Sequence, residues 1–241
     1  NSMFGGMPTY LVSLTFDFEP VQYLFRTATF WLPNPANRLF ACLLGFYILL
    51  LAFDVKRLYA VAGAISFGLS SFIIVGIVAG HNARIGAIGM MPVIVAGLHL
   101  VCTRRQFTGS LLLLAGLAIQ LLFNHLQITY YTMLLCGLYL LNELIFRWRA
   151  GTARELLKTA PYLLAAILLA AGMNAGRLLT LLEYSQYSNR APSELSTLAS
   201  YQEASGGVDK AYAFEYSNSL LEPMTLFIPN FMGGPSKQVL G

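Results

Sequence analysis

Residues 58–79, LYAVAGAISFGLSSFIIVGIVA, decide the class of fold. The stretch runs for 22 residues without a charged side chain. An α-helix rises about 1.5 Å per residue, so a helix of this length reaches across the ~30 Å hydrocarbon core of a bilayer. We therefore predict a transmembrane helix in this part of the chain.

The rest of the chain has the same apolar character. Of its 241 residues, 56% are hydrophobic and only 11% are charged, and the mean hydropathy is +0.62. Soluble domains carry about 25% charged residues. Six apolar segments are candidate spans: 39–53, 58–79, 85–102, 107–123, 126–146 and 159–182. The sequence predicts an all-α polytopic membrane protein with a six-helix bundle over residues 39–182.

Basic residues in the short connections predict the orientation of the bundle. Three connections at alternate span ends hold eight of them: Lys56, Arg57, Arg104, Arg105, Arg147, Arg149, Arg154 and Lys158. The opposite connections hold only Arg26, Arg38 and Arg84, and Arg38 is expected to extend its side chain to the membrane interface. Lys and Arg favour cytoplasmic loops. Residues 1–38 and 183–241 are therefore predicted on the outer, periplasmic side.

The two ends of the chain differ from the bundle. Residues 9–32 are apolar and aromatic with a few charges, which predicts an interfacial helix or a partly re-entrant segment. Residues 183–241 are polar and form a predicted outside loop, long enough to be a functional lid rather than an inert connection. Because the chain starts outside, at least one span is expected before Asn1, and further spans are expected after Gly241.

Polar side chains gather at the predicted outer ends of the spans. Eight are candidate substrate-binding residues: His81, Asn82, Arg84, Asn124, His125, Gln127, Asn174 and Arg177. Ionisable residues at membrane depth are costly and by default indicate a functional site. Arginine matches phosphate geometry, and histidine donates hydrogen bonds or moves protons near neutral pH. The pattern predicts binding of a phosphorylated lipid at the outer face.

Plainer explanations stand beside this interpretation. Arg84 could extend to lipid phosphates, His125 could cap a helix, and Arg177 could pair with Glu183. His99 and Glu143 lie near the inner ends of their spans and are expected to be interfacial rather than catalytic. The cysteines are expected to be buried small hydrophobes: Cys42, Cys102 and Cys136. Two glycine pairs with four-residue spacing predict close helix packing: Gly76 with Gly80, and Gly172 with Gly176.

Five stretches in chain order resemble the YfhO-type bacterial membrane proteins, in the form associated with Bacteroidetes. They are NSMFGGMPTY (1–10), GHNARI (80–85), NHLQITYY (124–131), LLEYSQYSNRAPSEL (181–195) and LFIPNFMGG (226–234). None is a catalytic signature. Members of that family are large proteins with many spans, similar in layout to the GT-C glycosyltransferases, which take a sugar from a polyprenyl-phosphate donor at the outer membrane face.

The resemblance implies a glycosyltransferase-like enzyme of the bacterial cytoplasmic membrane that decorates a surface glycan or lipid. The essential acid of GT-C enzymes lies early in the first outside loop, most of which is expected before Asn1. Asp17 and Glu19 could substitute as the general base that takes the proton of the acceptor hydroxyl. A divalent metal is possible, although no ligand cluster is evident, and no nucleic-acid partner is expected. A flippase for a lipid-linked sugar and a non-catalytic assembly factor remain alternatives.

Overall fold

The structure is a computed structural model that describes residues 2–3, 7–8, 20–103, 105–185, 221, 224 and 231. The chain divides into two compact units, residues 1–180 and 181–241, and the helix bundle lies in the first of them. The described strands of this first unit, β1 (Ser2–Met3) and β2 (Met7–Pro8), form a short antiparallel pair.

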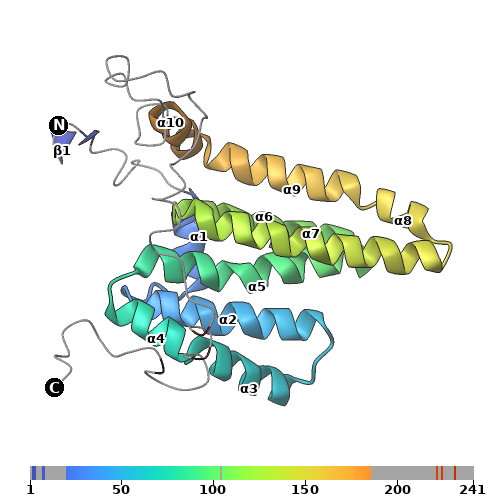
Figure 1. The fold of residues 1–241 in the computed structure, drawn as a ribbon, viewed down its shortest axis with the longest axis horizontal. Coiled ribbons are helices and arrows are strands. Elements are labelled where there is room, and N and C mark those ends of the chain that lie inside the picture. The colour runs from blue at the N-terminus through green and yellow to red at the C-terminus, as the bar shows by residue number, and fades with distance from the viewer. Residues whose placement is uncertain are drawn as a thin grey trace. The chain divides into compact units, whose positions relative to one another are not determined.

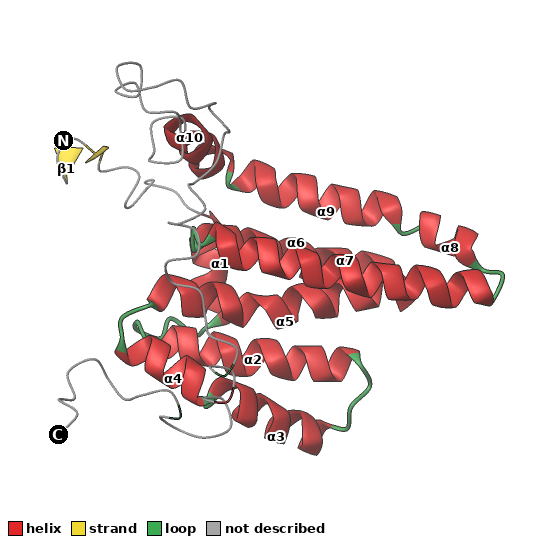
Figure 2. Ribbon diagram, viewed as in Figure 1, coloured by secondary structure: helices red, strands yellow, loops and turns green. Residues whose placement is uncertain are grey.

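All other described elements are helices, which confirms the all-α class (Figures 1 and 2). They are α1 (Pro20–Ala28), α2 (Ala36–Ala52), α3 (Arg57–Gly68), α4 (Ser71–Val78), α5 (Asn82–Thr103), α6 (Gln106–Leu122), α7 (Leu126–Arg149), α8 (Ala153–Leu157), α9 (Ala160–Met173) and α10 (Ala175–Ser185).

Several of these helices are long and apolar enough to cross a membrane. Three segments of the described chain qualify by themselves: α5, α7 and residues 153–173, which comprise α8 and α9. The bent pair α3–α4 makes a fourth if it counts as one span. Helices α2 and α6 have 17 residues each, about 25 Å of helix. The number of six spans stays a prediction.

Two of the expected spans are interrupted. Segment 58–79 forms α3 and α4, whose axes differ by 44°. The break falls at Ser70, whose extended backbone (φ −60°, ψ 148°) places it at the N-cap of α4, a position that serine favours. Segment 159–182 breaks at Asn174, where α9 ends and α10 follows.

Helix α5 forms the centre of the bundle. Within its most apolar 18 residues 72% are buried, against 11% for α7 and 17% for residues 153–173. Figure 1 shows α5 between α2 and α6, and α5 makes its most extensive contacts with these two helices. The three cysteines are free and buried, as predicted.

Of the predicted glycines, Gly76 does lie in a close contact, since a Cβ there would lie 2.6 Å from Cδ1 of Ile85 in α5. A Cβ added at Gly80 or Gly172 would meet no atom within 4 Å, so the expectation of close approach at these two positions is wrong. Instead, a Cβ at Gly97 of α5 would lie 2.5 Å from the backbone nitrogen of Leu113 in α6. Helices α5 and α6 therefore approach each other backbone to backbone.

Two buried amides tie the helices together. The Gln120 Nε2 group donates to the carbonyl oxygen of Ala87 and to Thr132 Oγ1, both at 2.9 Å, and so links α5, α6 and α7. The Asn174 Nδ2 group donates to the carbonyl oxygen of Ala118 at 3.1 Å and links the end of α9 to α6. Both side chains are almost fully buried.

We expect Gln120→Leu to lower the free energy of unfolding by about 1 kcal/mol, because interhelical hydrogen bonds in membranes contribute about 0.6–2 kcal/mol. The measurement is unfolding of the protein in mixed micelles with increasing SDS. Gln127→Leu is the matched control, since Gln127 is exposed and bonds only within α7, to the Tyr131 hydroxyl. An equal loss in both variants would contradict an interhelical role for Gln120.

Candidate functional site

The predicted polar turns lie at one end of the helix bundle. Helices α5, α6, α7 and α9 alternate in direction, so the start of α5, the α6–α7 turn and the end of α9 face the same way as the start of α2 (Figure 1). We call this the His81 end. The basic turns around Lys56, Arg105 and Arg149 lie at the opposite end, which we call the His99 end because His99 of α5 is near it.

The predicted site residues of the α4–α5 turn face different surroundings. His81 is exposed, whereas Asn82 and Arg84 in the first turn of α5 are partly buried. The Arg84 guanidinium lies over the Phe72 ring of α4, 5.3 Å from its centre. The Nε atom of Arg84 and the Oδ1 atom of Asn82 are buried, and neither has a hydrogen-bond partner.

In the α6–α7 turn, two of the three predicted residues have local explanations. Asn124 is exposed and has a φ of +53°, a left-handed conformation that asparagine tolerates after a helix. Gln127 is exposed and bonds to Tyr131. His125 stands at the N-cap of α7, but its side chain makes no capping hydrogen bond and its buried Nδ1 has no partner. The capping alternative for His125 is therefore wrong.

The last two predicted residues lie on either side of the α9–α10 break. Asn174 holds α9 against α6 through its amide nitrogen, so it has a structural task, while its buried Oδ1 has no partner. Arg177 is partly buried in α10. Pairing of Arg177 with Glu183 stays a prediction.

Sequence reasoning missed Arg38 as a site residue. Its guanidinium carbon lies 4.8 Å from the centre of the Phe25 ring and 4.5 Å from that of Phe123. The two rings come from α1 and from the end of α6 and meet edge to face at 5.1 Å. Arg38 is thus held by cation–π contacts on a platform that joins three helices, with its Nε buried and without a partner. No local pattern could reveal it, because Phe25 and Phe123 are far apart in sequence.

Unpartnered polar atoms mark the His81 end as a whole. The described residues contain eight buried side-chain nitrogen or oxygen atoms without a hydrogen-bond partner, on Asn37, Arg38, Asn82, Arg84, Gln120, His125, Thr129 and Asn174. Every one of these residues lies in the first or last turn of a helix, or in the adjoining turn, at the His81 end. An unsatisfied buried polar group costs about 1–3 kcal/mol. The concentration of such atoms at one end is typical of a site that binds a polar ligand.

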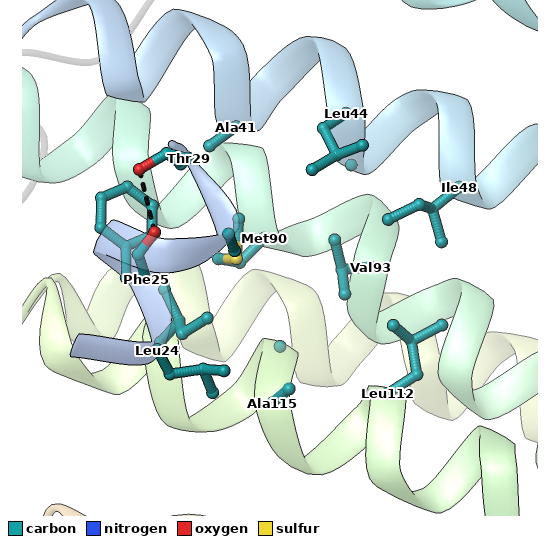
Figure 3. A pocket seen from close by; sticks show the side chains of 14 residues that line it. Leu24, Phe25, Thr29, Ala41, Leu44, Ile48, Met90, Val93, Leu112 and Ala115 are labelled. Atoms are coloured by element: carbon teal, nitrogen blue, oxygen red, sulfur yellow. Dashed lines mark hydrogen bonds between the residues drawn. The ribbon is translucent and has the colours of Figure 1, made fainter. Parts of the chain in front are cut away.

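An apolar cavity lies beside the Arg38 platform. It has a volume of about 130 Å³ and is lined by α1, α2, α5 and α6 (Figure 3). Phe25, which contacts Arg38, is one of its walls, and Ala41 and Met90 are others. The Thr29 hydroxyl, also at the wall, is occupied by a 2.9 Å hydrogen bond to the carbonyl oxygen of Phe25. A cationic group and a hydrocarbon-lined space therefore adjoin the same phenylalanine.

Two predicted features of the site stay predictions. Asp17 and Glu19, the expected general bases, lie outside the described residues. Within the described part of the chain, no three His, Cys, Asp or Glu side chains come together as metal ligands.

Comparison with known proteins gives no family model, no curated protein and no solved structure that matches this chain. Any function assigned to the chain therefore depends on the geometry of the described residues.

Proposed function

We propose that the His81 end binds the phosphate group of a membrane lipid. The observation that carries the proposal is the presence there of three buried nitrogens without a hydrogen-bond partner, on Arg38, Arg84 and His125; the four unpartnered amide oxygens at this end only accept hydrogen bonds and are not phosphate ligands. Arginine presents several N–H donors in a fixed plane that fits phosphate oxygens. A phosphate at this position would satisfy donors that the described residues leave without partners.

The apolar cavity beside Arg38 supports a lipid rather than a free anion. A cavity of about 150 Å³ lined by aliphatic and aromatic side chains can hold a molecule of benzene. The cavity between α1, α2, α5 and α6 has about 130 Å³, room for a short branched segment of hydrocarbon chain. A lipid with its phosphate at Arg38 would have such a space next to its first chain carbons.

In the full proposal, the protein is a six-span, GT-C-like glycosyltransferase of the bacterial cytoplasmic membrane. The donor is a sugar linked to polyprenyl phosphate at the periplasmic face. Arg38, Arg84 and His125 hold the donor phosphate, which becomes the leaving group. Asp17 or Glu19 takes the proton of the acceptor hydroxyl as its oxygen bonds to the sugar carbon. The apolar helices and the polar groups at one bundle end support this arrangement.

A second candidate function is transport of the same lipid-linked sugar across the membrane. The break between α3 and α4, with its 44° bend, favours it. Transporters commonly contain such interrupted helices where a substrate passes. The flippase would use the same phosphate-binding residues without forming or breaking a bond.

We expect Arg84→Gln to weaken binding of a radiolabelled polyprenyl-phosphate sugar by roughly tenfold or more, because a hydrogen bond to a charged group contributes about 1.5–3 kcal/mol. The protein is reconstituted in lipid nanodiscs, and both donor binding and sugar transfer are measured. Arg57→Gln is the matched control, since Arg57 is an exposed arginine at the opposite end.

Binding with turnover in the wild type, and loss of both in Arg84→Gln alone, supports the transferase. Binding without turnover, with movement of the labelled lipid between leaflets, supports the flippase. Equal binding by wild type, Arg84→Gln and Arg57→Gln would overturn the assignment of Arg84 to the phosphate.

A further inference from the structure

A second polar cluster lies at the His99 end of the bundle. The His99 Nδ1 atom is 2.7 Å from the hydroxyl oxygen of Tyr139 in α7. The Tyr139 hydroxyl in turn donates to Glu143 Oε1 at 3.4 Å. The His99 ring also stacks on Phe53, with centres 4.1 Å apart and planes 21° from parallel. Contacts with two other helical segments therefore fix the orientation of the imidazole, and the expectation that His99 and Glu143 are merely interfacial misses their connection.

The hydrogen-bond chain continues to an arginine. Arg147 Nε donates to Glu143 Oε2 at 3.1 Å, and the Arg147 guanidinium also donates to the carbonyl oxygen of Cys102. A second carboxylate, Glu155, lies 3.9 Å from Arg147. The pair of Arg147 and Glu143 is mostly buried, with 17% and 19% of the side chains exposed. Arg147 therefore holds Glu143 as an ionised carboxylate in a fixed position.

The hydrogen bonds from Arg147 to Glu143, from Tyr139 to Glu143 and between Tyr139 and His99 determine which ring nitrogen of His99 carries the hydrogen. An ionised carboxylate only accepts hydrogen bonds, so the Tyr139 hydroxyl proton points to Glu143. The Tyr139 oxygen then accepts from His99 Nδ1–H. The neutral imidazole is consequently the Nδ1–H tautomer, and its Nε2 atom carries a free lone pair. Nε2 is the ring nitrogen left to act on another molecule.

His99 also lines a cavity of about 540 Å³. Two exposed charged residues border the same cavity: Asp54, in the turn after α2, and Arg105, at the N-cap of α6. The remaining polar wall residue, Thr103, is occupied by a 2.8 Å bond to the His99 carbonyl oxygen. The cavity thus presents a permanent cation, a carboxylate and a protonatable nitrogen to whatever enters it.

We propose that this cavity is a second binding site, for an anion of the phosphate class. Arg105 donates to its charged oxygens, and Asp54 and the Nε2 lone pair of His99 accept from oxygens that still carry a proton. The site is separate from the His81 end and does not depend on the proposed transferase activity.

The test is nitrogen NMR of the protein labelled with ¹⁵N-histidine in phosphatidylcholine nanodiscs. The chain has three histidines, so single substitutions of His81 and His125 assign the His99 signals. At high pH the wild type should show the Nδ1–H tautomer of His99, and Tyr139→Phe should restore the Nε2–H form. Added inorganic phosphate should shift the His99 signals in the wild type and not in Arg105→Gln, which keeps the wild-type tautomer.

The source of the phosphate is resolved by a second arm with nanodiscs that contain phosphatidic acid and no free phosphate. A response to the lipid alone assigns the site to a headgroup, and a response to inorganic phosphate alone assigns it to a soluble ligand. Arg149→Gln, an exposed arginine at the same end, is the control and should respond as the wild type does. An Nε2–H tautomer in the wild type, no response to either phosphate, or an equal response in Arg105→Gln would overturn the proposal.

Discussion

Gly97→Val should lower the free energy of unfolding by about 3 kcal/mol, at the upper end of the usual cost of overpacking a core. A Cβ at position 97 would lie 2.5 Å from the nitrogen and 2.8 Å from the Cα of Leu113, and 2.9 Å from the carbonyl oxygen of Gly109. All three atoms belong to the backbone of α6, so no side chain can turn aside. The two helices with the most extensive mutual contact in the bundle would have to separate. Unfolding by SDS in mixed micelles measures the loss.

Gly137→Val is the control for this substitution. Gly137 lies in α7, and a Cβ there would meet nothing within 4 Å. The same change of residue should therefore alter the stability by less than about 0.5 kcal/mol, as at an ordinary surface position. Gly97→Ala should fall between the two, because its single added carbon still overlaps the α6 backbone. A Gly97→Val protein as stable as the wild type would contradict the close contact of α5 and α6.

The apolar runs of the sequence predict where helices lie. Each of the six predicted segments contains a helix or a pair of helices, because uncharged stretches of about 20 residues satisfy their own backbone polar groups only as helices when they are buried in hydrocarbon. The interruptions were less visible. Ser70 and Asn174 are ordinary polar residues inside apolar runs. Ser70 takes the N-cap position of α4. Asn174 bonds to the carbonyl oxygen of Ala118 in α6, a contact that no local pattern shows.

Pairings between distant residues could not be predicted. The four-residue spacing indicates Gly76, which does pack closely, but also Gly80 and Gly172, where an added Cβ would meet no atom within 4 Å. The closest contact of α5 with α6 involves Gly97 and Gly109, which are twelve residues apart and lie on different helices. Which glycines lie at a contact depends on which helices face each other. A pattern within one helix does not contain that information. The same reason hides the link from His99 to Tyr139, 40 residues away.

The sequence predicts that polar residues lie at the His81 end. It does not predict which of them are the best candidates for a binding site. Costly polar residues at span ends indicated Arg84 and His125, and both have buried atoms without partners. Gln120 gives no local signal, because it is a single amide in an apolar run. The sequence alone indicates only an interface position for Arg38, because the aromatic rings that hold it come from other segments.

Arg38→Met should weaken binding of a polyprenyl-phosphate sugar by roughly 10- to 100-fold, the effect of losing a hydrogen bond between charged groups. Methionine retains an apolar stem between the Phe25 and Phe123 rings, so the platform keeps its packing while the donors are lost. Arg38→Lys should bind with intermediate affinity. Lysine keeps the charge but lacks the flat guanidinium that stacks on rings and donates two parallel hydrogen bonds. Donor binding in nanodiscs, with SDS unfolding as a check on the fold, measures both variants.

Arg26→Met separates a specific phosphate contact from a general loss of positive charge. Arg26 is adjacent to Phe25 in the chain and is exposed, with its guanidinium 5.6 Å from the centre of the Trp31 ring. Both substitutions remove one positive charge from the same region, so a purely long-range attraction would weaken equally in the two variants and would vanish at high salt. A contact inside the site predicts a large loss for Arg38→Met that persists at high salt, and less than a twofold change for Arg26→Met. Equal losses in the two variants would leave Arg38 as a structural clamp between α1, α2 and α6 and would move the phosphate to Arg84 and His125.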